Sequence, residues 1–435
     1  MQSLIETMKF VELQFTDFFG RIKSVSIPVE QAERAFQNGV WFDGSSIEGF
    51  ARIHESDMYL VPEKETLAEL PWTSPERRVG RVFCDVFTPD GNPFAGDPRF
   101  ILKKMLQEAK KQGFIFNTGP ELEFFLFQRD GIHSPVPNDV GGYFDYSPKD
   151  IANTVRKDAV MALQGLGLDV EAEHHEVAHG QHEIDFKYDS ALRTADNAIT
   201  FKYCIKSISQ QHGLYASFMP KPVFGQNGSG MHVHQSIFDS RGNNLFFDEH
   251  DRYRLSPMAY HFIAGQMAFI KDMIAILCPT VNSYKRLLPG YEAACYICWA
   301  QVNRSALIRI PRIFPGRTHA ARAELRCPDP SCNPYLAFAV MLKAGLEGIR
   351  QGLEPPEPVN EDVYRFTAEE LEARGIDTLP ASLYDAVMAF KKSKLMKDLF
   401  GEETHDKYVQ AKLAEWDDYR MQVTDWERAR YFENV

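Results

Sequence analysis

The sequence predicts an α+β protein with a small, β-rich N-terminal domain and a large second domain of mixed strands and helices. Two observations support this fold class. The N-terminal region contains short alternating runs, such as KFVELQF at 9–15, separated by turn residues. From Asp97-Pro98 onward, strand-like runs alternate with long helical patterns. We therefore expect a domain boundary at 93–97, with residues 1–95 in the first domain and residues 96–435 in the second.

The N-terminal domain is expected to open with two strands. Residues 9–15 form the first, Thr16-Asp17 and Gly20 turn the chain, and residues 21–27 form the second. Residues 42–50, FDGSSIEGF, are rich in glycine and serine, which indicates an exposed loop.

The second domain is expected to begin with a capped helix. Asp97 stands at the N-cap with Pro98 at the first helical position, and Gly113 follows the last apolar residue of the helical pattern. Strands are predicted over 121–127 and 184–188. Helices are predicted at about 148–165, 190–212, 256–277 and 334–351, and in a tail from Pro380 with aromatic anchors at Trp416, Tyr419, Trp426 and Tyr431.

Charge and cysteine content limit the classes of partner and compartment. The formal net charge is −12, which argues against a general nucleic-acid or anionic-membrane binder because such binding needs a positive surface. The most apolar long stretch, 259–281, is interrupted by polar residues, and the N-terminal MQSLIETMKF lacks a signal layout. Seven cysteines are too sparse for a disulfide framework, so we expect a reduced, cytoplasmic protein.

Three short motifs place polar residues two positions apart within strand-like surroundings. They are Glu121-Leu-Glu123, His232-Val-His234 and Glu324-Leu-Arg326. In a strand, positions i and i+2 share one face, so each pair is expected to line one side while the intervening residue packs behind it. One such pair is an ordinary feature of an exposed strand, but three with ionisable residues favour a site.

A fourth cluster lies at 174–183, HHEVAHGQHE. Glu176 and Glu183 are seven residues apart, and Gly180 offers a bend that lets both point inward. The complete set contains five carboxylates and one imidazole: Glu121, Glu123, Glu176, Glu183, Glu324 and His232. Oxygen-rich ligation suits Mg²⁺ or Mn²⁺, and six ligands exceed what one Mg²⁺ takes from protein, so two ions are predicted.

One segment is strongly basic, although the chain as a whole is acidic. Residues 304–326 hold six arginines and a single acid, Glu324, and arginine binds phosphate and carboxylate in a bidentate manner. The glycine-rich 227–230 leads directly into Met231-His232 and allows a ligand to approach the backbone closely. Together with the metal ligands, these features predict phosphoryl transfer from ATP as co-substrate, without a P-loop or a kinase-type catalytic loop.

A zinc or redox role is the competing interpretation. Cys295 and Cys298 form a C-x-x-C, with Cys327 and Cys332 further along. The surrounding YEAACYICWA has the pattern of a strand, in which positions i and i+3 face opposite sides. Buried structural thiols are therefore the favoured interpretation.

The motifs together resemble those of glutamine synthetase, type I. The similar segments are FDGSSIEGF (42–50), GPELEFF (119–125), HHEVAHGQHEIDF (174–186), FMPKPVFGQNGSGMHVH (218–234), NSYKRLLPGYEA (282–293), NRSALIRIP (303–311) and ELRCPDPSCNPYLA (324–337). The resemblance implies an N-terminal β-grasp domain and a catalytic domain with a curved antiparallel sheet flanked by helices. It also implies a homododecamer of two stacked hexameric rings whose active sites are shared between neighbouring subunits.

The resemblance implies a reaction in which ATP, L-glutamate and ammonia give glutamine, ADP and phosphate through γ-glutamyl phosphate. It assigns one metal ion to Glu123, Glu176 and Glu183, and the other to Glu121, His232 and Glu324. The glutamate substrate is expected to contact Asn227, Gly228, Arg286 and Arg326. The nucleotide is expected to contact Glu171, His234, Ser236, Arg304 and Arg309, with Arg304 also steadying the transferred phosphoryl group.

Two further residues receive catalytic roles from the resemblance. Asp43 is expected to bind ammonium and take its proton, because only neutral ammonia has a lone pair that can attack. Glu292 is expected to lie on a flap that shields the acyl phosphate from water, and to accept the later proton.

Two other functions compete with this one. A γ-glutamyl-amine ligase performs the same chemistry on methylamine or a polyamine, but relatives of that kind tend to lose the Asp-Gly-Ser-Ser loop, and Asp43 is present here. An inactive nitrogen-sensing ring is expected to lose metal ligands or the flap glutamate, and this chain keeps them.

Overall fold

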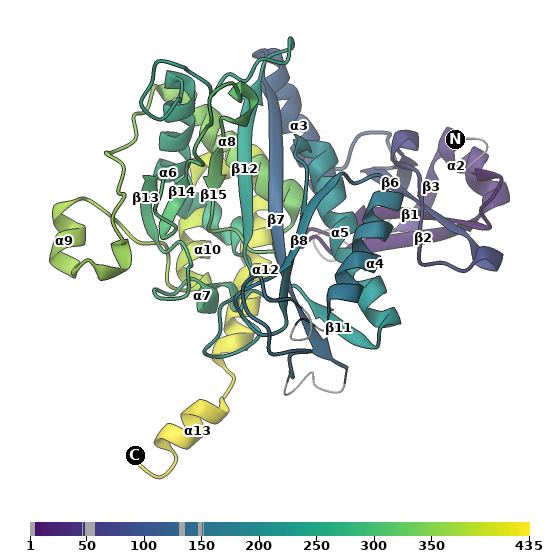
Figure 1. Ribbon diagram of the computed structural model, residues 1–435. Helices are drawn as coiled ribbons and strands as arrows, with labels where there is room; N and C mark the ends of the chain where they lie inside the picture. The colour runs from purple at the N-terminus through teal and green to yellow at the C-terminus, as the bar shows by residue number, and fades with distance from the viewer. Residues whose placement is uncertain (1–4, 46, 48–56, 130–134, 147–149, 151) are drawn as a thin grey trace.

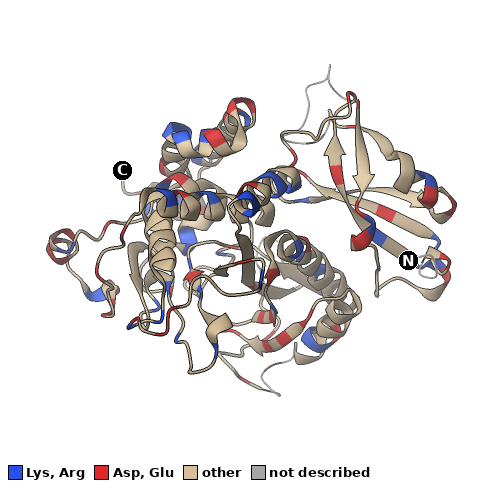
Figure 2. Cartoon of the chain, turned by 90° about the horizontal axis from the view of Figure 1, so that it is seen from above, with Lys and Arg blue, Asp and Glu red and all other residues tan. Residues whose placement is uncertain are grey.

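The computed structural model describes residues 5–45, 47, 57–129, 135–146, 150 and 152–435. Two lobes are visible, a small N-terminal sheet and a larger lobe in which helices surround a long sheet (Figure 1). Acidic and basic residues occur over both lobes (Figure 2), so the negative net charge is not confined to one of them.

The N-terminal lobe is a six-stranded sheet in the order β2-β1-β6-β4-β3, with β5 paired to β6. Its strands are β1 (Phe10–Thr16), β2 (Ile22–Pro28), β3 (Val40–Asp43), β4 (Asp57–Pro62), β5 (Ala68–Glu69) and β6 (Val79–Phe87), accompanied by helix α2 (Ala32–Asn38). β1 and β2 form the predicted antiparallel hairpin, and β1 also pairs in parallel with β6. Side chains alternate between the two faces of each strand, so Val11 and Leu13 of β1 are buried with Val82 and Val86 of β6. These residues belong to a hydrophobic core that is separate from the core of the larger lobe.

The larger lobe contains a nine-stranded sheet in the order β13-β14-β15-β12-β7-β9-β8, with β10 and β11 also paired to β7. Its strands are β7 (Ile115–Gln128), β8 (Val170–His175), β9 (Gln181–Phe186), β10 (Asp189–Ser190), β11 (Leu214–Ser217), β12 (Met231–Phe238), β13 (Tyr296–Ala300), β14 (Ala306–Arg309) and β15 (Ala323–Leu325). The sheet is mixed rather than wholly antiparallel, because β13 and β14 run parallel. Both strands of this pair are mostly buried, as is typical of parallel ladders.

Helices pack around this sheet. They are α3 (Pro98–Lys111), α4 (Asn153–Gly165), α5 (Ala191–Gln211), α6 (Pro257–Leu277), α7 (Ser283–Arg286), α8 (Pro334–Gln351), α9 (Ala368–Ala373), α10 (Leu383–Lys392), α11 (Lys394–Phe400), α12 (Glu402–Arg420) and α13 (Asp425–Tyr431). Short 3-10 turns lie at Val29–Gln31, Lys64–Thr66, Pro75–Arg77, Thr318–Ala320 and Val363–Arg365. The Asp97 cap is confirmed, since its side chain accepts a hydrogen bond from the Arg99 backbone N–H. α5, α6 and α8 agree with the predicted ranges, whereas α4 begins later than predicted, at Asn153.

The C-terminal tail is helical as predicted, but not all of its aromatic residues anchor it. Trp416 packs against the main core, and its ring lies 6.1 Å from that of Tyr384. Trp426 and Tyr431 belong to α13, which projects away from the lobe (Figure 1), and they are 63% and 45% exposed. Within one chain, therefore, the prediction that these two residues are anchors is wrong.

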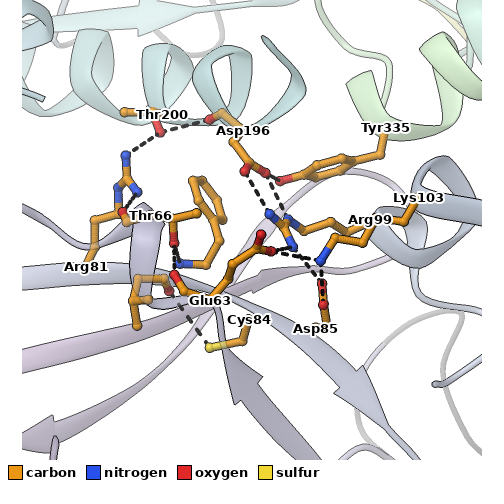
Figure 3. Close-up of polar contacts among 12 residues, drawn as sticks. Glu63, Thr66, Arg81, Cys84, Asp85, Arg99, Lys103, Asp196, Thr200 and Tyr335 are labelled. Atoms are coloured by element: carbon orange, nitrogen blue, oxygen red, sulfur yellow. Dashed lines mark hydrogen bonds and ion pairs between the residues drawn. The ribbon is translucent and has the colours of Figure 1, made fainter. Parts of the chain in front are cut away.

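A partly buried ion-pair network joins the two lobes (Figure 3). Arg99 of α3 donates from Nε and Nη2 to both carboxylate oxygens of Asp196 on α5, at 3.0 and 2.9 Å. Its Nη1 reaches Glu63 at 2.5 Å and Asp85 at 2.6 Å, and both acids belong to the N-terminal lobe. Lys103 joins the same two carboxylates at 2.8 and 2.6 Å. The network holds the small lobe against α3 and α5 through charge-assisted hydrogen bonds.

Candidate active site

Two neighbouring strands present a ladder of four carboxylates. On β7 and β9, Glu121 lies opposite Asp185 and Glu123 lies opposite Glu183. The alternate residues Leu122 and Ile184 point the other way and are completely buried in the core. Like charges directly opposite each other across a sheet are destabilising, so a bound cation or protonation is needed to neutralise the repulsion between these carboxylates.

One group of metal-ligating atoms is formed by Glu121, His232 and Glu324. One ligand atom from each of the three lies within 4.8 Å of the other two. His232 of β12 is in register with Glu121, and its Nδ1 lies 3.3 Å from Glu121 Oε2. Burial opposes the charge on Glu121, but His234 and His232 hold the pKa of this carboxyl well below its usual range. The sequence prediction that these three residues meet agrees with their positions.

Glu123, Glu176 and Glu183 form a second, more strongly repelling group. Burial raises the pKa of Glu123 to about 7, although Arg286 and the Gly230 N–H oppose the rise. Burial and the nearby Glu123 raise the pKa of Glu176 to about 7. Burial and the nearby Glu123 raise the pKa of Glu183 well above its usual range. Three carboxylates that disfavour one another's charge provide the donor set that a hard divalent cation requires.

Two arginines surround Glu324 on the opposite side of the site. Arg309 lies in register with Glu324, and its Nη1 donates to Oε2 at 2.8 Å. Arg326 donates from Nη1 to the other oxygen, and from Nε to the Arg304 carbonyl at 3.2 Å. Burial opposes the charge of Glu324, and Arg326 is the main group that lowers the pKa of this carboxyl. The predicted basic segment therefore reaches the metal-ligand set directly.

The glycine-rich loop lies beside Arg286. A Cβ on Gly228 would stand 2.2 Å from the Pro220 carbonyl oxygen, so this position accepts only glycine. The Gly228 carbonyl accepts a hydrogen bond from Gln181 at 3.1 Å. Arg286 is buried and donates to the carbonyls of Cys327 at 2.8 Å and Arg326 at 3.2 Å, which fixes its guanidinium beneath the loop. Asn227 precedes Gly228 and is half-buried.

Four of the predicted nucleotide residues, Glu171, His234, Ser236 and Arg309, lie on β8, β12 and β14. His234 Nε2 lies 2.7 Å from Glu121 Oε1, and its Nδ1 accepts from Arg322 Nε at 3.1 Å. His234 thus links a predicted metal ligand to the arginine segment. Ser236 follows on the same face of β12 and is buried, whereas Glu171 of β8 is exposed and electrostatically coupled to Arg322.

Two further predicted residues of the larger lobe, Arg304 and Glu292, are exposed. The nearby charge of Arg304 opposes the rise in the pKa of Tyr143 that burial and Glu176 cause. Glu292 is exposed, and its charge contributes to the raised pKa of Glu176, which places it near the second group. Its backbone has φ of 56°, a left-handed conformation that is uncommon outside glycine.

Asp43 lies apart from these residues in the same chain. It ends β3 in the N-terminal lobe, whereas β7 and β12 lie in the larger lobe (Figure 1). Its carboxylate is exposed and accepts from the Ser45 N–H at 2.8 Å. Hydrogen bonds from the Ser45 side chain and backbone lower the pKa of Asp43. Part of the predicted 42–50 loop, residues 46 and 48–50, lies outside the described residues.

The cysteines give no support to the zinc alternative. All seven are free and buried. Burial raises the pKa of Cys295 to about 12 and that of Cys298 to about 11, which leaves both thiols protonated and unreactive.

Comparison with protein families identifies the chain. Residues 7–89 match the family profile "Glutamine synthetase, beta-Grasp domain". Residues 95–431 match "Glutamine synthetase, catalytic domain". The chain belongs to the glutamine synthetase family.

Curated relatives in the glutamine synthetase family match over nearly their full length. The glutamine synthetase of Clostridium saccharobutylicum is 52% identical over 98% of this chain and 95% of its own. That of Methanosarcina mazei is 53% identical over 98% of this chain and 94% of its own. Enzymes of this family depend on ATP and use divalent metal ions, in agreement with the oxygen-rich donor set described above.

Solved structures show the same fold. A structure named "GmaS/ADP complex" has a TM-score of 0.90 and 33% identity, and the match covers 99% of this chain and 98% of that one. The glutamine synthetase of Plasmodium falciparum, with a TM-score of 0.88 and 24% identity, covers 99% and 98% of the two chains and supports the fold alone. In the part of the chain that the structure describes, no helix combines the length and apolar character of a membrane span.

Several residues at this candidate site were not predicted from the sequence. Gln181 donates to Glu123 at 3.0 Å and to the Gly228 carbonyl, which ties a metal ligand to the glycine-rich loop. Asp185 shares a face with Glu183, and one of its oxygens is buried with no hydrogen-bond partner among the described residues. Both residues follow the i, i+2 rule from Glu183, so the same rule applied to QHEID would have found them. Tyr143 carried no such signal, because it reaches the site from a loop.

Proposed function

We propose that this chain ligates ammonia to the γ-carboxylate of L-glutamate with ATP, and releases L-glutamine, ADP and phosphate. The strongest support is that two clusters of carboxylate-bearing residues lie close to Arg309 and Arg326. They occur in a chain that matches both domains of the family. The carboxylates suit cations that accompany nucleotide phosphates, and the arginines suit the anionic substrates.

The finer proposal for the metal is two Mg²⁺ or Mn²⁺ ions per site. We assign Glu123, Glu176 and Glu183 to one ion, and Glu121, His232 and Glu324 to the other. When bound, such ions neutralise phosphate charge and polarise the transferred phosphoryl group. The raised pKa values of the first trio support the assignment, because a cation relieves the repulsion that raises them.

We assign the amino-acid end of glutamate to Asn227 and Gly228, and its carboxylates to Arg286 and Arg326. The support is that Arg286 is buried directly beneath Gly228, in a position fixed by two backbone carbonyls. The nucleotide is assigned to Glu171, His234, Ser236, Arg304 and Arg309, which lie on or beside the strands that carry the metal ligands. Arg304 also faces the γ-phosphate in this proposal, because among the described residues it has no carboxylate ion pair of the kind that holds Arg309 and Arg326.

The chemistry then proceeds in two steps. A γ-carboxylate oxygen of glutamate attacks the γ-phosphorus of ATP, and ADP leaves. Asp43, held ionised by Ser45, takes a proton from ammonium, and the ammonia nitrogen attacks the acyl carbon with loss of phosphate. Glu292 covers the intermediate from water and accepts the proton that the attacking nitrogen loses as the amide forms, roles supported by its exposed segment beside Glu176.

Assembly into a homododecamer of two stacked hexameric rings is also proposed. Two features of the single chain support assembly: Asp43 lies in a different lobe from the metal ligands, and α13 exposes Trp426 and Phe432. A neighbouring subunit would supply Asp43 to the site and cover the apolar residues of α13. We also propose a cytoplasmic location, which the seven unpaired cysteines support.

A panel of amines tests the substrate. Phosphate release is measured with ATP, glutamate and either ammonium, methylamine or a polyamine, each at the same free-amine concentration. We expect the highest kcat/KM with ammonia. A clear preference for methylamine or a polyamine would establish the γ-glutamyl-amine ligase instead, and no turnover with any amine would favour the inactive ring.

A further inference from the structure

The hairpin that carries Glu176 and Glu183 has two distinct faces. On one face, His174, Glu183 and Asp185 lie close together and point into the candidate site. On the other face, His175 and His182 are paired across β8 and β9, with ring centroids 4.8 Å apart. Both rings are almost completely buried, so they point away from the substrates and into the protein.

Asp139 lies beneath this second face and contacts both ends of the loop between β8 and β9. Its Oδ1 accepts a hydrogen bond from the Gly180 N–H at 3.0 Å, at the end that leads into Glu183. The same oxygen lies 2.9 Å from His175 Nε2. His175 in turn places Nδ1 2.6 Å from the carbonyl oxygen of Glu176, at the other end of the loop.

These contacts define the protonation of His175. A backbone carbonyl only accepts hydrogen bonds, so His175 Nδ1 must donate to the Glu176 oxygen. Asp139 Oδ1 already accepts from two backbone N–H groups, those of Gly180 and Gly141. An ionised Asp139 therefore accepts from His175 Nε2 as well, and the pair is a buried imidazolium–carboxylate contact.

Arg156 of α4 fixes His182, the second ring. Its Nη1 lies 2.9 Å from His182 Nδ1 and its two terminal nitrogens bind Asp150 at 2.9 and 2.6 Å. Its Nε donates to Glu173, which precedes His175 by two residues on β8. Because arginine only donates, His182 Nδ1 is the unprotonated nitrogen.

The same arrangement argues against a third metal ion at Asp139, His175 and His182. Ligand atoms of these residues lie within 4.8 Å of one another. Both ring nitrogens of His175 are used as donors, however, and His182 Nδ1 faces a guanidinium cation. A divalent ion at this place would find the histidine nitrogens already engaged in hydrogen bonds, and the guanidinium of Arg156 would repel it.

We propose that Asp139 and His175 are positioning residues that fix the β8–β9 loop, and through it the direction of Glu176 and Glu183 toward the metal ion. The inference rests on the proposed assignment of those glutamates as metal ligands. Partners outside the ligand shell typically change metal affinity by about 10–100-fold when they are removed. Asp139 acts at a distance from the metal, since its hydrogen bonds end on the Gly141 and Gly180 N–H groups, the Asn138 side-chain amide and His175, none of which is a proposed metal ligand.

The test measures Mn²⁺ binding to the purified, fully assembled enzyme without substrates. For Asp139→Asn, which keeps the size but removes the charge, we expect the Kd for the tightest Mn²⁺ to rise by about 10-fold or more. The control is Asp97→Asn, another buried aspartate, whose oxygens accept from the Val86 and Arg99 N–H groups far from the hairpin. We expect this control to lower Tm while leaving the Kd for Mn²⁺ unchanged.

Further variants separate the possible failures. If Asp139→Asn does not assemble, His175→Asn tests the same link, because it keeps a donor toward Glu176 but cannot reach Asp139; we expect the same rise in Kd. Glu183→Gln must weaken Mn²⁺ binding if the metal assignment is right. Wild-type affinity in Glu183→Gln overturns the proposed function, whereas weak binding in Glu183→Gln with wild-type affinity in Asp139→Asn or His175→Asn overturns only the positioning role.

Discussion

At the scale of single residues, buried carboxylates organise both the lobe boundary and the site. Asp97 is an example outside the site: it is 1% exposed and accepts two backbone N–H groups. Burial and the nearby Asp85 raise the pKa of Asp97 to about 7. The folded chain therefore keeps a proton that the unfolded chain releases near its usual pKa of 3.8.

This difference predicts a pH-dependent stability. Because the folded-state pKa is raised, the contribution of Asp97 to stability is fully present below pH 4 and is lost as the pH rises toward 7. Asp97→Asn cannot titrate, so the Tm of the wild type relative to this variant is expected to fall by a few degrees between pH 5 and pH 8. Thermal unfolding followed by circular dichroism measures the difference, and a pH-independent difference would contradict the raised pKa.

Individual site residues were predictable where strand periodicity applied. Glu121 and Glu123 face one side of β7 with Leu122 buried behind them, as the i, i+2 rule requires. Tyr143 and Arg156 were not predictable, because they meet the hairpin from a loop and a helix that are distant in sequence. Their contacts depend on tertiary packing, which periodicity does not encode.

At the scale of elements, the β8–β9 hairpin depends on one glycine. Gly180 has φ of 67°, and a Cβ there would stand 2.8 Å from the Leu126 carbonyl oxygen. The predicted bend is therefore present, and it allows Glu176 and Glu183 to contribute to one site despite their odd separation.

We expect Gly180→Ala to weaken the hairpin and the metal site together. The change combines backbone strain of about 1 kcal/mol with a steric clash, and should lower the affinity for Mn²⁺. The control is Gly213→Ala, which has φ of 72° but open space around the added methyl group, so it reports the strain alone. Equal losses of Tm and equal Mn²⁺ affinity in the two variants would argue against a special role for Gly180.

Other elements show the limits of sequence reasoning. The long helices α5, α6 and α8 follow from their apolar periodicity, and side-chain caps at Ser256 and Asn333 mark the starts of α6 and α8. The parallel pairing of β13 with β14 was not predictable, because an apolar run has the same pattern in either direction. The exposure of α13 was also missed, because the prediction relied on its aromatic residues, although four of its seven residues are charged.

At the scale of the whole molecule, the separation of Asp43 from the metal ligands predicts a shared site. Asp43→Ala is expected to abolish glutamine formation while ATP binding persists, and Glu183→Gln is expected to be inactive for loss of metal. Unfolded and reassembled together in equal amounts, the two inactive chains should regain about a quarter of the wild-type activity, because random pairing joins intact halves at that frequency. Absence of any regained activity in correctly sized oligomers would place each site within one chain.

The most direct test of the central claim follows the oxygen atoms of the substrate. Glutamate labelled with ¹⁸O in both γ-carboxylate oxygens is incubated with ATP and ammonium, and the released phosphate is analysed by mass spectrometry. Attack of the carboxylate on ATP, followed by attack of ammonia on the acyl carbon, leaves one labelled oxygen on every phosphate. We predict phosphate carrying one ¹⁸O in amounts equal to the glutamine formed; unlabelled phosphate would contradict a reaction through γ-glutamyl phosphate.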